Sequence, residues 1–223
     1  NYINSDWAVG VVDVTNASAV YVTGLGGFRL TVDKAGGGAC GVGHRLAYSS
    51  WMITNGTLQL GTPSRACSLY VGCREDWTVG WSQGVMTLSN ATFDANLGVC
   101  YVGWAGEVSG TGELDLRNAR MANGTLTAND LQVGRSAYSP SQGYIKVGPA
   151  SGLTNLTVLT NLKIGGGGGT LGRIGDPDNG YRLPAGVNVT LGTWGVTRCN
   201  VTLGEHTYAW VGPADGLLAA SAG

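Results

Sequence analysis

Residues 90–103 read NATFDANLGVCYVG, and residues 123–134 read NGTLTANDLQVG. Both stretches open with Asn-x-Thr, carry Ala-Asn a few residues later, and end on a hydrophobic residue, any residue, Val and Gly. This Val-Gly motif (with Ile for Val in its last copy) closes on Gly43, Gly72, Gly103, Gly134 and Gly165, so that the gaps between copies are 29, 31, 31 and 31. A period this constant predicts a stack of structural repeats.

A second motif, Gly–x–hydrophobic–x–hydrophobic, keeps nearly the same interval. Its copies begin at Gly26, Gly56, Gly84, Gly112 and Gly143, so that the gaps are 30, 28, 28 and 31. Both motifs alternate apolar and polar residues, which is the pattern of a β-strand with one buried face. We find no i, i+3, i+4, i+7 stripe of an amphipathic helix over three turns. The repeat is therefore expected to consist of strands.

A repeat of about 30 residues made of short strands and Gly or Asn corners predicts an all-β fold, a parallel β-helix (β-solenoid) with coils about 4.8 Å apart. About seven coils would account for residues 1–223 as a single domain. Regular coils are expected over residues 26–165. Irregular coils and a large loop are expected over residues 166–223, where both motifs are lost and DPDNG (176–180) indicates a tight turn. A β-sandwich is the alternative, because turn signals also recur at short intervals.

The inward positions of the Val-Gly motif predict a core ladder. Its residues are Leu69, Val71, Cys100, Val102, Leu131, Val133, Leu162 and Ile164. Cys40 occupies the same position as Cys100, and the distance of two coil spacings would hold the two thiols about 10 Å apart, too far for a disulfide. Pairing among the five cysteines (Cys40, Cys67, Cys73, Cys100 and Cys199) is otherwise left open.

Asn-x-Ser/Thr sequons are in excess. They start at Asn16, Asn55, Asn90, Asn123, Asn155, Asn188 and Asn200. Given 14 Asn and 35 Ser plus Thr in 223 residues, chance predicts about two sequons, and the chain has seven. One interpretation is N-glycosylation, which would make covalent glycans partners of this chain and place it outside the cytoplasm. The other is that corners of the repeat favour Asn and strands favour Thr without any sugar.

Composition excludes several partners. Only 12% of the residues are charged and the net charge is −1, so neither nucleic acid nor an anionic membrane surface is expected to bind. No apolar run approaches the roughly 20 residues that span a bilayer. The first residue is Asn1 and not Met, from which we expect processing, as in the removal of a signal peptide from a secreted protein.

We expect no catalytic site, no metal site and no cofactor. No cysteine pair has the tight CxxC spacing of a zinc or redox site. The two histidines, His44 and His206, lie near no Gly-x-Ser-x-Gly elbow. A carboxylate cluster on one face is conceivable for Glu107, Glu113 and Asp115, but Asp115 alternates with leucines and is expected to be an ordinary solvent-facing strand residue.

Seven Trp and nine Tyr residues have two possible uses. Trp81 and Trp104 each follow a Val-Gly pair directly. Such residues form either sugar-stacking platforms or stacks between neighbouring coils, and the second use is the commoner.

The strand ends LYVG, CYVG and LQVG, alternating with GVMTL and GELDL, resemble the Gly-rich β-helical repeats of bacterial surface proteins, notably autotransporter passenger domains and related exported repeat proteins. The similarity covers residues 26–165. It implies a secreted, elongated surface or matrix protein. It transfers no catalytic residue to this chain.

We therefore expect an extracellular structural protein, glycosylated, that assembles with itself head to tail into a filament or surface layer. The alternating pattern starts at Trp7, and the C-terminal GLLAASAG carries no charge, so neither pole shows the capping helix or charge that blocks edge pairing. An adhesin or glycan-binding module is the alternative. A polysaccharide-active β-helical enzyme is a third hypothesis.

Overall fold

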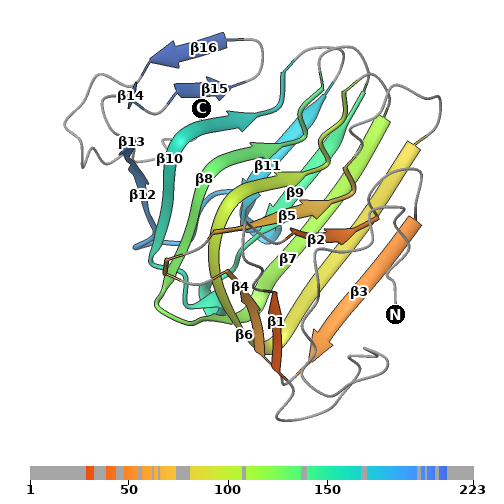
Figure 1. Cartoon of the computed structure of the whole chain (residues 1–223), viewed down its shortest axis with the longest axis vertical. Coiled ribbons are helices and arrows are strands. Elements are labelled where there is room, and N and C mark those ends of the chain that lie inside the picture. Colours follow the sequence, from red (N-terminus) through yellow and green to blue (C-terminus); the bar gives the residue numbers. More distant parts are fainter. Residues whose placement is uncertain are drawn as a thin grey trace.

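The computed structural model describes residues 29–32, 39–43, 48–54, 57–61, 63–64, 66–73, 81–106, 109–136, 140–166, 170–194, 197–198, 200–203 and 206–209. These residues form an all-β, mostly parallel β-solenoid, in which successive coils of the chain lie side by side (Figure 1). Each complete coil carries three strand segments, and each segment pairs with its equivalent in the next coil. We call the three resulting stacks the first, second and third ladders.

The first ladder contains the long, nearly straight strands on one side of the solenoid. Its members are β3 (Tyr48–Thr54), residues 81–89 of β6 (Trp81–Val102), β7 (Ser109–Met121), β9 (Gln142–Lys146) and β11 (Leu171–Gly175). All neighbours in this ladder pair in parallel. One column of the register contains Ser49 of β3 and then four glycines in succession: Gly84, Gly112, Gly143 and Gly172.

The second ladder follows a corner of the chain. Its members are β1 (Arg29–Val32), β4 (Thr57–Leu60), the middle of β6, the first halves of β8 (Thr125–Val133) and β10 (Asn155–Ile164), and β12 (Asn188–Leu191). Asn90 in β6 (φ 51°) lies at the corner from the first ladder and has a left-handed backbone. Gly124 and Gly152, which precede the second-ladder segments of the next two coils, are also left-handed. Glycine and asparagine are the residues that tolerate this conformation best.

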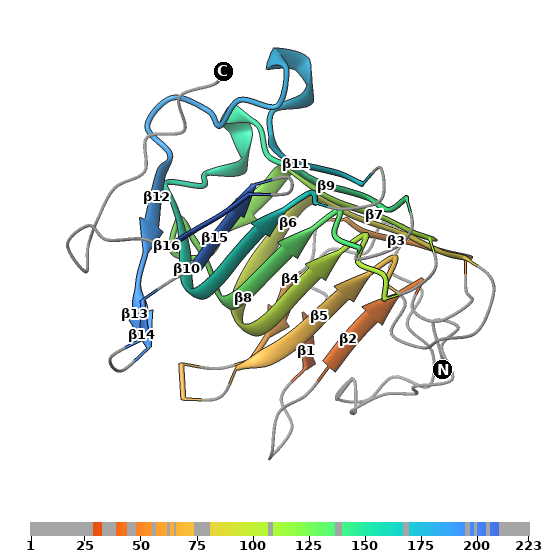
Figure 2. The same cartoon turned by 90° about the horizontal axis from the view of Figure 1, so that it is seen from above.

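The third ladder completes the coil. Its members are β2 (Ala39–Val42), β5 (Cys67–Val71), the last part of β6, the second halves of β8 and β10, and β15 (Asn200–Leu203). Figure 2 shows these strands in sequence order across the molecule. The remaining elements are β16 (His206–Ala209), which pairs with β15, the pair β13 (Thr193–Trp194) and β14 (Thr197–Arg198), and the short 3₁₀ helices η1 (Pro149–Ser151) and η2 (Pro177–Asn179).

Parallel pairing decides between the two folds that the sequence left open. In the described part of the chain, antiparallel pairs are confined to β15–β16, β13–β14 and one bridge between Asp176 and Arg182. A sandwich of antiparallel hairpins would show the opposite balance. The β-solenoid prediction is therefore confirmed for these residues. They make about four turns, so the expectation of seven coils is not confirmed.

The two sequence motifs do not map onto two ladders as expected. The Val-Gly motif lies in the third ladder throughout, but the Gly-led motif divides between the other two. Its copies at Gly84, Gly112 and Gly143 lie in the first ladder, whereas residues 57–60 form β4 and pair with β1 in the second. One coil contains two similar strands, and the interval between copies of the motif does not separate them.

The pattern also continues beyond Gly165, where both motifs were expected to end. β11 pairs with β9 and places Gly172 beside Gly143, so the first ladder gains another strand. The expected tight turn at residues 176–180 is present. Asp176 accepts a hydrogen bond from the backbone N–H of Asp178 (3.1 Å), and Gly180 is left-handed.

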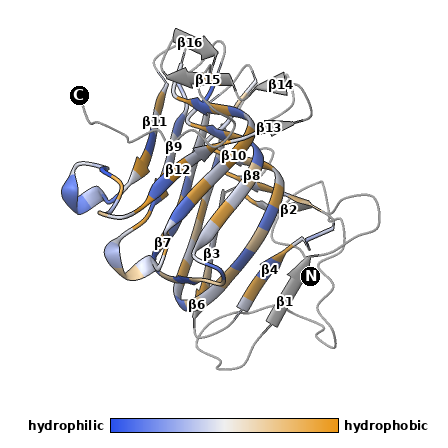
Figure 3. Ribbon diagram, turned by 90° about the vertical axis from the view of Figure 1, so that its left-hand side faces the viewer, coloured by the Kyte–Doolittle hydropathy of each residue, from blue (hydrophilic) through white to orange (hydrophobic). Residues whose placement is uncertain are grey.

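The core lies between the three ladders and consists of inward side chains stacked coil on coil. Seven of the eight expected core-ladder residues are buried: Leu69, Val71, Cys100, Val102, Leu131, Val133 and Leu162. The eighth, Ile164, is partly buried and packs against the same core. Figure 3 shows hydrophobic and hydrophilic residues alternating along β6, β7 and β8, as inward and outward positions require.

The third ladder meets the first along a seam of glycines. Gly103 is left-handed (φ 62°), and a Cβ there would overlap the backbone carbonyl of Gln142. A Cβ on Gly143 would fall within 3.0 Å of the Val102 carbonyl oxygen and of the Gly134 backbone. The same reciprocal fit recurs in the pairs Gly43–Gly84, Gly72–Gly112 and Gly134–Gly172. Side chains cannot enter the seam, which is why both motifs keep glycine at a shared period.

Candidate glycosylation sites and polar outer faces

Four of the seven sequon asparagines have described side chains. Asn90, Asn123 and Asn188 are exposed, and Asn155 is partly buried. Asn16, Asn55 and the side chain of Asn200 lie outside the described residues.

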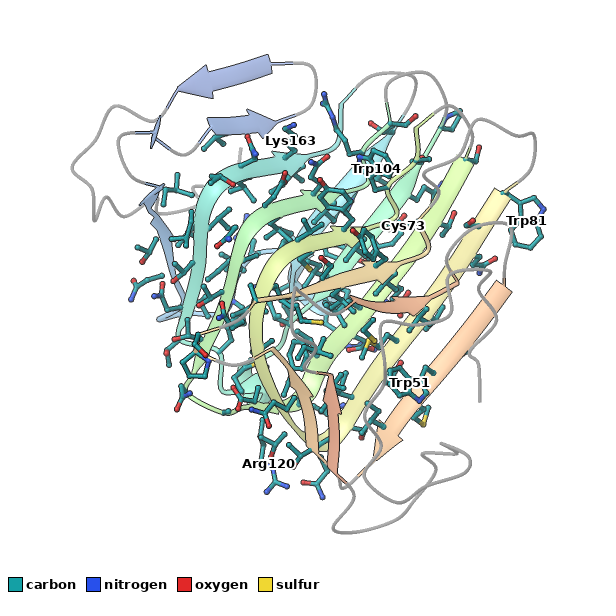
Figure 4. The ribbon with its side chains drawn as sticks, viewed as in Figure 1. Trp51, Cys73, Trp81, Trp104, Arg120 and Lys163 are labelled. Carbon is teal, nitrogen blue, oxygen red and sulfur yellow. The ribbon has the colours of Figure 1, made fainter. Side chains whose placement is uncertain are left out.

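Asn90 sits at the corner between the first and second ladders. Its left-handed φ gives a reason for asparagine at this position that requires no sugar. Its backbone carbonyl accepts a hydrogen bond from the Arg120 guanidinium of the next coil (3.1 Å). Arg120 is labelled at this corner in Figure 4. The Asn90 side chain is exposed beside a fixed backbone.

Asn123 lies in a turn of the next coil, between β7 and β8. Arg120 pairs with Thr92, so this turn lies beyond the position that matches Asn90. Here the following residue, Gly124, has the left-handed backbone (φ 65°) and Asn123 itself does not. The Asn123 backbone carbonyl accepts a hydrogen bond from the Thr125 hydroxyl (3.3 Å), which fixes the sequon in its turn. The corner requirement that applies at Asn90 therefore does not explain asparagine here.

Asn155 and Asn188 lie side by side in neighbouring coils. The Asn155 amide nitrogen donates to the Thr157 hydroxyl of its own sequon (3.0 Å), and its amide oxygen accepts from Thr190 in the next coil (2.9 Å). These bonds connect two coils on the outer face of the second ladder. Asn155 thus has a structural role that exposed Asn188 lacks.

Aromatic side chains gather on the outer face of the third ladder. Tyr70 and Tyr101 are neighbours in the register, with an edge-to-face contact at 5.8 Å between ring centroids. Trp104 follows the seam glycine and stacks on Tyr101 at 5.3 Å. Figure 4 places Trp104 near this end of the ladder and Trp81 at the rim, where it is 56% exposed. Tyr70 and Tyr101 thus pack against each other between neighbouring coils, which is the commoner of the two expected uses of aromatic residues.

A polar network lies beside these rings, and sequence reasoning missed it. The Tyr101 hydroxyl donates to the Asp130 carboxylate (3.3 Å) and accepts from the buried Gln132 amide (3.0 Å). Gln132 and Asn161 also donate to Asp130. Burial, and then the charge of Asp130, raises the pKa of Tyr101. The sequence period could have pointed to this network. The same outward position in successive coils is occupied by Tyr70, Tyr101, Gln132 and Lys163.

Asp115 does not face solvent as expected. It lies on the outer face of the first ladder but is only 7% exposed, because Arg117 covers it. The Arg117 guanidinium donates to its carboxylate at 2.7 Å, and the Arg117 backbone N–H donates at 3.1 Å. Burial alone raises the pKa of Asp115, but these hydrogen bonds and the charges of Arg117 and Lys146 hold it below its usual value. Glu113 forms an ion pair with Lys146, and Glu107 lies outside the described residues.

A strained tyrosine lies on the same face. Tyr181 has φ 60°, an unusual backbone for an aromatic residue, directly after the DPDNG turn. Its ring packs against Tyr144 (5.8 Å), and the Arg173 guanidinium lies over it at 5.2 Å. Burial raises the pKa of Tyr181. These contacts pack the turn against β9 and β11.

The described residues offer no metal centre and no exposed thiol. Among them, no group of three or more His, Cys, Asp or Glu side chains is placed to hold a metal ion. Cys40, Cys67, Cys73 and Cys100 are all buried. Burial, with a smaller contribution from Cys67, raises the pKa of Cys40 to about 12, and burial also raises the pKa of Cys100. In this part of the chain, no helix has the length and apolar character that crossing a bilayer requires.

Comparisons with known proteins identified no relative of this chain. Family models, curated proteins and solved structures each gave no match.

Proposed function

We propose that this chain is an extracellular, non-enzymatic structural glycoprotein: a rigid β-solenoid that carries N-linked glycans and stacks head to tail with copies of itself into a filament or surface layer. The observation that carries the proposal is the exposure of three sequon asparagines, Asn90, Asn123 and Asn188, on the outside of a regular solenoid. Sugars at these positions lie outside the solenoid and leave the apolar core undisturbed.

Surface chemistry supports the glycans. The chain has 12% charged residues, about half the usual fraction for a soluble domain of roughly 25%. Met52 and Trp81 are each more than half exposed. Glycans are bulky and solubilising, and they supply the hydration that a surface with few charges lacks.

Stacking supports the assembly. Every coil offers its backbone N–H and C=O groups to the coil on either side, and the third ladder continues in register from one coil to the next. At one end of the solenoid, β16 already pairs antiparallel with β15 of the third ladder. There the contact between chains would form through the first and second ladders, whose last described strands are β11 and β12. A contact between unlike ends is heterologous and gives an open filament when its rotation does not close.

The experiment separates the two parts of the proposal. The full chain is secreted from a glycosylating host, and its intact mass is compared with 22.9 kDa before and after enzymatic removal of N-glycans. Electron microscopy of the same material is expected to show rods longer than one chain. A secreted chain at the bare mass would refute glycosylation, and a monodisperse monomer at high concentration would refute head-to-tail assembly.

A glycan-binding module is the second candidate, and the Tyr101–Trp104 stack favours it. Aromatic faces beside the acceptor and donor groups of Asp130 and Asn161 are chemistry that suits a sugar. The test is binding to immobilised polysaccharides. Trp104→Ala is expected to abolish the retention and Trp81→Ala to preserve it; equal retention of both variants would contradict this candidate.

A further inference from the structure

A polar groove crosses three coils on the outer face of the second ladder. Its volume is about 330 Å³, at the lower end of the range of about 300–1,000 Å³ for ligand sites. The polar side chains that line it are Gln59, Asp94, Asn96, Asn123, Thr125 and Thr127. The groove therefore has room for one small ligand.

The register explains how these residues meet. Gln59 of β4 lies opposite Asp94 of β6, and Asn96 of β6 lies opposite Thr127 of β8. All four occupy outward positions of the second ladder. The turn that carries Asn123 forms one wall, so a sequon asparagine borders the groove.

The lining matches a neutral ligand that carries hydroxyl and amide groups. Asp94 makes no hydrogen bond or ion pair within the described part of the chain, so its carboxylate is available to accept from two hydroxyl groups. The Thr127 hydroxyl both donates and accepts. Pro63 and Ala95 add apolar surface against which a C–H face or a methyl group packs. An N-acetylhexosamine has all of these groups.

We propose that this groove holds the first sugar of a glycan attached to Asn123. The inference rests on the glycosylation part of the proposed function. A covalently attached sugar is present at the groove at an effective concentration in the millimolar range, so a few hydrogen bonds suffice to dock it where a free sugar would bind weakly. Asn90 and Asn188 do not line the groove, and their glycans extend into solvent.

The test measures the release of glycans at each site from the native, full chain secreted by a glycosylating host. A peptide N-glycosidase removes the glycans, and mass spectrometry follows Asn123 and Asn188 separately. Release at Asn123 is expected to be about tenfold slower than at Asn188, the factor that corresponds to a docked state favoured by about 1.4 kcal/mol. After denaturation, both sites are expected to react at one rate.

Two variants show whether the groove causes the difference. Asp94→Ala and the nearly isosteric Thr127→Val are each expected to bring the native rate at Asn123 up to that at Asn188, with circular dichroism showing an unchanged fold. A glycan on Asn123 that is released as fast as the one on Asn188 would overturn this inference and leave glycosylation standing. An unmodified Asn123 beside a modified Asn188 would also overturn it alone, and a chain without any glycan would overturn both.

Discussion

Replacing Gly143 with alanine adds a single methyl group to the glycine seam and so tests how tightly the first and third ladders pack there. Gly143 has no positive φ, so alanine suits its backbone conformation and the effect comes from contacts alone. The new Cβ would lie closer than 3.0 Å to the Val102 carbonyl oxygen and to the Gly134 amide nitrogen, and 2.9 Å from the Gly134 Cα. All of these are backbone atoms, which cannot rotate away.

The expected loss of stability follows from those contacts. The coils must separate locally, and the hydrogen bond from the Gly134 N–H to the Val102 carbonyl (2.8 Å) breaks. Overpacking typically costs about 1–3 kcal/mol, and a buried backbone group left without its partner costs a further 1–3 kcal/mol or so. We expect Gly143→Ala to cost about 4 kcal/mol, a large share of the roughly 5–15 kcal/mol that stabilises an ordinary domain.

Two control variants separate sterics from backbone conformation in urea unfolding followed by circular dichroism. Gly148→Ala places its Cβ 3.5 Å from the nearest atom at φ −127°, so a change within about 0.5 kcal/mol is expected. Gly152→Ala has open space but φ 65°, which costs about 1–2 kcal/mol. If Gly143→Ala unfolds within about 1 kcal/mol of Gly148→Ala, the two columns of glycine do not interlock and the reasoning is wrong.

Three further predictions concern single side chains. Asp115→Asn is expected to cost about 1 kcal/mol at pH 7, given the partial exposure of Arg117; because the folded pKa of Asp115 is lowered, the difference from wild type should shrink progressively as the pH falls below about 4, the unfolded pKa of Asp, and a constant difference in urea midpoint from pH 7 to pH 3 would contradict this. Tyr101→Phe leaves the buried Gln132 amide short of an acceptor and should cost about 1 kcal/mol in the same assay, whereas an unchanged midpoint would show that the hydroxyl is dispensable. With its pKa at about 12, Cys40 should resist alkylation by iodoacetamide at pH 8 until urea unfolds the chain, and rapid labelling of the native protein would count against its burial.

Much of the fold could be predicted because, in a solenoid, residues that pair in neighbouring coils are separated by a nearly constant number of residues in the sequence. The sequence interval from Cys100 to Leu131 is the same as that from Leu131 to Leu162, and it equals the register of the third ladder. Glycine follows each third-ladder strand from β2 to β10, because the left-handed turn at Gly103 and its equivalents excludes a side chain. Apolar alternation then identifies the inward residues.

The assignment of strands to ladders could not be predicted in the same way. Each coil contains two similar alternating strands, and the Gly-led motif occurs in either of them: it precedes β4 in the second ladder but lies in β6, β7 and β9 of the first. The register between β6 and β7 also shifts on both sides of the Ser89–Asn118 pair. The prediction that Asp115 faces solvent was wrong because Arg117 forms an ion pair with it and covers it. Apolar–polar alternation shows which side chains point outward, but it does not show whether a neighbouring side chain covers them. The hydrogen-bond network around Asp130 joins side chains from neighbouring coils. Apolar–polar alternation identifies these residues as outward and polar, but it does not show that they bond to one another.

For the candidate glycosylation sites, the sequence identifies which asparagines could carry a sugar, but it does not show what surrounds each of them. The sequon pattern identifies Asn123 and Asn155 equally. The structure separates them, since Asn155 binds hydroxyl groups of two coils while Asn123 borders a groove. Glycosylation at either residue remains a prediction.

The parallel in-register solenoid is the central claim, and methyl–methyl nuclear Overhauser contacts test it most directly. In the third ladder, contacts should join residues whose numbers differ by one constant interval, such as Val102 with Val133 and Leu131 with Leu162. Contacts between pairs whose residue numbers have a constant sum would reveal antiparallel hairpins and contradict the solenoid.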